Sequence, residues 1–89
     1  MSRVIEHVKM ISPTPGDHMF EVPVGITNLR VALDPDDGDA ILIHYDRDNP
    51  VMSTQRTTFH VMHDFHTVDV TFTLIGTVVW NGTSLHLYW

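Results

Sequence analysis

The chain has no cysteine among its 89 residues, although it carries seven histidines. Without cysteine there is no disulfide scaffold, and such a composition fits a protein made in a reducing cytoplasm. No apolar run has the length of a membrane-spanning helix, and the opening segment MSRVIEHVKM lacks the apolar stretch of a signal peptide. We therefore expect a soluble, cytoplasmic protein.

Residues that favour helices are almost missing as well: there are two alanines, two glutamates, one lysine and one glutamine. Valine, isoleucine, threonine and aromatic residues are frequent instead, which is typical of strands. The length suits one domain with one modest core. We expect residues 1–89 to form a single all-β domain.

Positive charge is scarce, because five lysines and arginines stand against eleven acidic residues and give a formal charge of −6. A chain this acidic is repelled by nucleic-acid phosphates and by anionic membrane surfaces. We expect neither as a partner.

Alternating apolar residues and turn signals predict about seven strands. The predicted strands are residues 3–11, 18–22, 28–33, 40–46, 57–66, 68–80 and 83–89. Antiparallel strands of this number and length form a small sandwich or a partly open barrel.

The dipeptide Asn81-Gly82 lies between two β-rich runs and predicts a two-residue hairpin with a type I′ turn. This turn fixes the register, so that Trp80 faces Thr83 and pairing continues outward. The predicted core face holds Val78, Leu85, Leu74 and Trp89, and continues back through Phe72, Val70 and Val68. A bend is expected at Gly76, since a straight strand over 68–80 would span roughly 43 Å.

The opposite face of this hairpin predicts an interface. It carries Ile75, Val79, His86 and Tyr88, a partly apolar set that a domain of this size has little material to cover. We expect a homo-oligomer, most simply a dimer, with the 74–89 hairpin at the contact. The alternative is a monomer in which residues 3–11 fold over this face.

Three equally spaced histidines, His60, His63 and His66, lie in the segment FHVMHDFHTVD. On a straight strand His63 leaves the face shared by the other two, which then lie about 20 Å apart. That distance excludes a shared zinc ion, whose imidazole ligands stand at about 2 Å. Exposed strand histidines are the favoured interpretation. Zinc or nickel binding by His60, His63, Asp64, His66 and His86 stays open if a turn falls near 62–65 or if copies meet at an oligomer axis.

The acidic segment DPDDGDA, residues 34–40, is interpreted as a turn rather than a calcium loop. An EF-hand loop needs glycine at its sixth position and a bidentate glutamate at its twelfth. Here Gly38 is fifth and no such glutamate follows. The sequence also lacks a nucleophile elbow and a phosphate-binding glycine loop, so we predict a non-enzymatic protein without a cofactor.

Three segments, EVPVGITNLRVALD (21–34), AILIHYD (40–46) and LIGTVVWNGTSLHLYW (74–89), resemble a family of small β-domains of actinobacterial bacteriophages. The resemblance implies a phage-type accessory protein in a bacterial cytoplasm, and it carries no site residues. The expected function is binding to protein, either to itself or to a host target. The alternatives are a histidine-based metal-binding protein and a minor virion component.

Overall fold

A computed structural model describes residues 2–89. These residues form seven strands and, within the described range, no helix. The strands are β1 (Ser2–Ile11), β2 (Gly16–Pro23), β3 (Thr27–Leu33), β4 (Ala40–Asn49), β5 (Thr54–Met62), β6 (Leu74–Trp80) and β7 (Thr83–Tyr88). The all-β prediction is confirmed.

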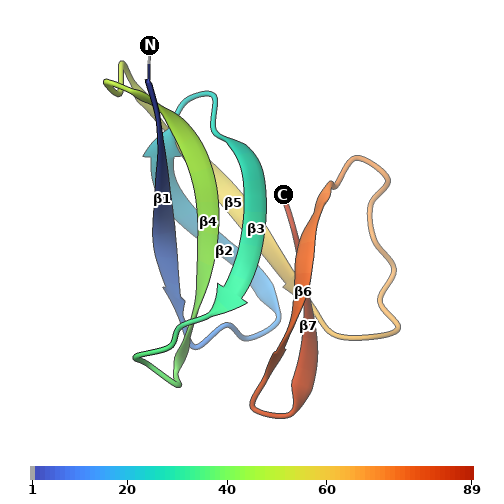
Figure 1. The fold of residues 1–89 in the computed structure, drawn as a ribbon. Helices are drawn as coiled ribbons and strands as arrows, with labels where there is room; N and C mark the ends of the chain where they lie inside the picture. Colours follow the sequence, from blue (N-terminus) through green and yellow to red (C-terminus); the bar gives the residue numbers. More distant parts are fainter. Residues whose placement is uncertain (1) are drawn as a thin grey trace.

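The strands form two antiparallel sheets that pack face to face (Figure 1). One sheet has the order β1-β4-β3 and the other β2-β5-β7-β6. On one side of the molecule β3 and β6, each an edge of its own sheet, lie next to each other. The arrangement is a sandwich and not a closed barrel, which decides between the two predicted architectures.

The core lies between the sheets and is apolar throughout. Its buried centre comprises Met10, Ile41, Ile43, Phe59, Val61, Leu85 and Leu87. These residues alternate with exposed or half-buried ones on β1, β5 and β7, as strands with one buried face require. The central strand β4 is buried on both faces from Ala40 to Ile43, which explains its uninterrupted apolar run.

The terminal hairpin has the predicted turn and most of the predicted register. Both turn residues have positive φ, 49° at Asn81 and 76° at Gly82, as a type I′ turn requires. Trp80 pairs with Thr83, and the pairing runs as expected to Gly76 opposite Leu87. A bulge between Leu74 and Gly76 then shifts the ladder by one residue.

Because of this bulge, two side chains lie on the opposite faces of the strand from those predicted. Leu74 pairs with Tyr88, a position that the sequence assigned to Ile75. Consequently Ile75 packs against the core, while Leu74 is 55% exposed. A one-residue slip exchanges the two faces of a strand, and here it affects only residues that precede the bulge.

The predicted long strand over 68–80 is wrong, since β6 begins only at Leu74 and β5 ends at Met62. Residues 63–73 form a loop, here called the β5–β6 loop. Phe65 has a φ of 63°, which an extended strand excludes. Asp69 Oδ1 accepts hydrogen bonds from the Thr71 backbone N–H and hydroxyl, a local turn that replaces sheet pairing. Val70, predicted to be in the core, is 98% exposed.

The first strand does not cover the terminal hairpin. β1 pairs with β4 over its whole length, in the other sheet. The alternative in which residues 3–11 fold over the face of Val79 is therefore wrong. Part of that face lies instead under the β5–β6 loop.

Candidate functional site

The β5–β6 loop is tied to the sheet by side-chain and backbone contacts. Asp64 Oδ1 accepts a hydrogen bond from Nε2 of His86, on β7, at 2.5 Å. The hydroxyl of Thr77 lies 3.0 Å from the other ring nitrogen of His86. At the far end of the loop, the backbones of Thr73 and Trp89 exchange two hydrogen bonds. The loop is therefore held in position at both ends.

Next to Thr73, the loop also rests on the sheet through Phe72. Phe72 stacks on the ring of His60, with centroids 3.9 Å apart and planes inclined by 7°. His60 in turn lies 2.7 Å from Asp17 on the neighbouring strand β2. Phe72, which the sequence placed in the core, therefore packs on the outer face of the sheet. It covers the ring of His60, whose side chain is 15% exposed.

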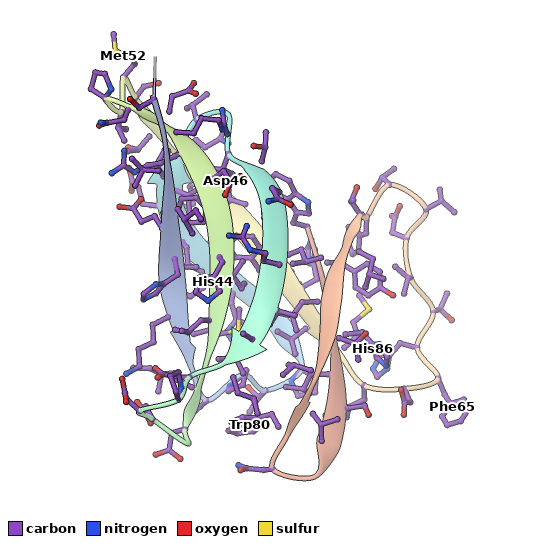
Figure 2. The ribbon with its side chains drawn as sticks, viewed as in Figure 1. His44, Asp46, Met52, Phe65, Trp80 and His86 are labelled. Atoms are coloured by element: carbon purple, nitrogen blue, oxygen red, sulfur yellow. The ribbon has the colours of Figure 1, made fainter. Side chains whose placement is uncertain are left out.

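Two apolar side chains of the loop are exposed, although the loop around them is anchored. Phe65 is fully exposed, and Val70 nearly so. Figure 2 shows Phe65 at the outer corner where the loop leaves β5, with its ring directed away from the body of the molecule. Its positive φ is rare for a bulky residue and costs free energy. An exposed aromatic side chain on a strained backbone has no role in packing.

Behind Phe65 lies a shallow depression of about 270 Å³. It is lined by His63, Asp64, Phe65, His66, Val68, His86 and Tyr88. Its floor belongs to β7 and its rim to the loop. The arrangement can receive a small side chain of a partner beside the Phe65 ring.

The four predicted interface residues do not form one patch. Val79 is exposed at 57%, as expected. Ile75 belongs to the core, while His86 and Tyr88 are half-buried and line the depression next to the loop. The exposed apolar surface on this side consists of Phe65, Val70, Leu74 and Val79. The sequence prediction missed Phe65 and Val70 because it interpreted this segment as strand, and it assigned Leu74 to the core because it did not include the bulge.

The histidine cluster is split between two places. The turn that metal binding required does occur, and it brings the rings of His63 and His66 to 6.1 Å. His66 is committed to its own loop, because Nδ1 donates to the His63 carbonyl at 2.5 Å. His60 lies apart, between Asp17 and Phe72. Within residues 2–89 no three histidine or acidic side chains are arranged to hold a metal ion.

The acidic segment after β3 is a turn, as predicted, and it joins two paired strands. The carboxylates of Asp34 and Asp37 each accept a hydrogen bond from the backbone two residues on. Lys9 of β1 lies 2.8 Å from Asp37 and 3.5 Å from Asp34. The hydrogen bond from Lys9 lowers the pKa of Asp37, and the same contact raises the pKa of Lys9. The positive charge that these carboxylates contact is therefore Lys9 of the same chain.

No family model, curated protein or solved structure matches this chain. The part of the chain that the structure describes contains no helix long and apolar enough to cross a membrane.

Proposed function

We propose that this protein is a non-enzymatic binding domain that recognises another protein through the β5–β6 loop. The observation that carries the proposal is Phe65, which is fully exposed although its backbone is held in the left-handed region. Strain of this kind persists where the surrounding structure enforces it, and it gathers at ligand-binding segments. The contacts of Asp64 and Thr73 provide that enforcement.

The free energy that burial of these exposed side chains would contribute favours a role in binding. Full burial of a Phe or Val side chain is worth about 1.5–3 kcal/mol. Phe65 and Val70 together would therefore contribute about 3–6 kcal/mol to a complex, enough to act as its central anchors. Neither contributes to the fold, because neither is buried in it.

The residues of the loop also indicate what kind of surface the partner presents. Asp64 and Asp69 flank the apolar residues, and the whole chain is acidic. A complementary surface has an apolar pocket for the Phe65 ring with basic residues at its rim. The resemblance to the actinobacteriophage β-domains makes a bacterial host protein in the cytoplasm the proposed target.

The proposal is tested by comparing the proteins that three forms of the chain retain from an actinobacterial lysate. These forms are the wild type, the double variant Phe65→Ser with Val70→Ser, and Met52→Ser. Met52 is the matched control, because it is equally exposed but lies at the opposite end of the molecule (Figure 2). We expect a protein that binds the wild type and Met52→Ser and is lost from the double variant.

The same experiment can contradict the proposal. If no protein distinguishes the double variant from the control at any salt concentration, the loop is not the binding surface. Circular dichroism must show the same β-sheet spectrum for all three forms, which the exposure of the replaced side chains predicts.

A further inference from the structure

The sandwich has four edge strands, and three of them are obstructed. β3 and β6 lie against each other, and each carries an irregularity in its pairing. β2 is shorter than β1 and ends in Pro23, which has no N–H to donate to an added strand. β1 has neither proline nor bulge, and its ten residues pair with β4 without interruption. Its outer edge is therefore a straight row of backbone donors and acceptors without a strand beside it.

The charged side chains that usually protect such an edge are drawn away from it. Arg3 pairs with Asp48 on β4 at 2.8 Å, and Lys9 pairs with Asp37 in the β3–β4 turn. On the inner face, Glu6 accepts hydrogen bonds from Tyr45 and Arg47, both on β4. All three charged residues of β1 are thus bound on the side of β4, and none is left to repel an incoming strand.

The apolar residues of β1 also favour the pairing of its free edge with another strand. Ile5 is 68% exposed on the outer face, and Ile11 is similarly exposed at the end of the strand. His7 lies between them on the same face and is exposed. A strand placed beside β1 would cover part of both isoleucines.

We propose that a second copy of this chain adds to β1 in antiparallel fashion, joining the two β1-β4-β3 sheets into one six-stranded sheet. In the register that we infer, His7 lies opposite the partner's His7. Ile5 then lies opposite the partner's Lys9, and Arg3 opposite the partner's Ile11. The new ladder covers residues 3–11 of both copies.

The neighbouring registers fit less well. A shift by two residues in one direction places Glu6 opposite the partner's Glu6 and Arg3 opposite the partner's Lys9, two like-charge pairs that destabilise a sheet. A shift in the other direction shortens the ladder and places His7 opposite the partner's Lys9. The register centred on His7 is the longest one without opposed like charges.

This dimer leaves the β5–β6 loop free, because β1 and the loop lie on opposite sides of the molecule (Figure 1). Self-association and binding of another protein would then use separate surfaces. A dimer presents two Phe65 loops, so its affinity for a partner with two sites would exceed that of one loop.

The absence of cysteine allows a direct test by single substitutions. His7→Cys places two thiols across the two-fold axis, at the separation of directly opposed strand residues, which a disulfide can bridge. Met19→Cys is the matched control, since Met19 is 61% exposed on the edge strand β2 of the other sheet. On mild oxidation we expect a covalent dimer from His7→Cys at least tenfold faster than from Met19→Cys.

The second arm measures mass by light scattering at pH 8 over a concentration series. We expect twice the chain mass of 10.2 kDa for the wild type and for Met19→Lys. Ile5→Lys places a second ammonium group opposite the partner's Lys9 and should weaken self-association by about tenfold, which corresponds to about 1.4 kcal/mol. The β-sheet spectrum should be unchanged in all variants, because the replaced side chains are exposed.

Three results overturn the inference. The first is a mass of 10.2 kDa for the wild type at every concentration up to millimolar. The second is a dimer that Val79→Glu dissociates and Ile5→Lys does not, which would place the contact on the terminal hairpin. The third is equal oxidation of the two cysteine variants.

Discussion

Replacing Phe65 by glycine should make the protein more stable. The φ of Phe65 is 63°, in the left-handed region, where a residue with a Cβ is strained by about 1–2 kcal/mol. Glycine removes this strain but loses more backbone entropy on folding, at a cost of about 0.5–1 kcal/mol. Because the side chain is fully exposed, the substitution removes no packing. The net expectation is a gain of about 0.75 kcal/mol in the free energy of unfolding, within a range of about 0–1.5 kcal/mol.

Urea denaturation followed by tryptophan fluorescence measures this change. Two control variants separate the release of backbone strain from the loss of the ring and from the entropy cost of glycine. Phe65→Ala removes the ring but keeps the strain, so its free energy of unfolding should match that of the wild type. Met52→Gly changes an equally exposed residue outside the left-handed region, and should cost about 0.5–1 kcal/mol. If Phe65→Gly is no more stable than Phe65→Ala, the strain is not stored at this residue and the case for a binding loop loses its main support.

Two further predictions concern the sandwich itself. A Cβ on Gly76 would lie 2.9 Å from Cγ1 of Val31, so Gly76→Ala should lower the free energy of unfolding by about 1–3 kcal/mol, and combining it with Val31→Ala should recover part of that loss. Burial, followed by the hydrogen bond to Glu6, raises the pKa of Tyr45 from 10 to about 12. The folded state therefore favours the neutral phenol, and the resulting stability is complete below pH 10 and is lost as the pH rises towards 12. Denaturation midpoints should fall more steeply across this range in the wild type than in Tyr45→Phe, which keeps the contribution of the raised Lys9 pKa, and equal pH profiles would contradict it.

The terminal hairpin shows how far local sequence determines structure. Asn81-Gly82 fixes the turn and, through it, the pairing back to Gly76, since a two-residue type I′ turn permits one register. The prediction fails at Leu74 and Ile75, where a bulge begins. The sequence predicts a bend at Gly76. Which side chain then faces the core depends on the close approach of β3, a contact between distant parts of the chain.

The loop was missed for a related reason. Val68, Val70 and Phe72 alternate as strand residues do, and no proline or glycine interrupts them. What prevents a strand is a set of contacts that spacing does not reveal, above all Asp64 with His86 and Phe72 with His60. Of the histidines that suggested a metal site, His60 and His86 are the partners in these contacts, while the ring of His66 bonds within the loop, to the His63 carbonyl.

Phe65 is the proposed point of contact with another protein, and a photo-crosslinking side chain at that position tests this role most directly. Benzoylphenylalanine in place of Phe65 preserves an aromatic ring at the outer corner of the loop, and the same group in place of Met52 serves as the control at the far end of the molecule. After irradiation in bacterial cells, we expect one defined adduct from position 65 that position 52 does not give. No adduct at position 65, or the same adducts from both positions, would contradict the proposal that the loop binds protein.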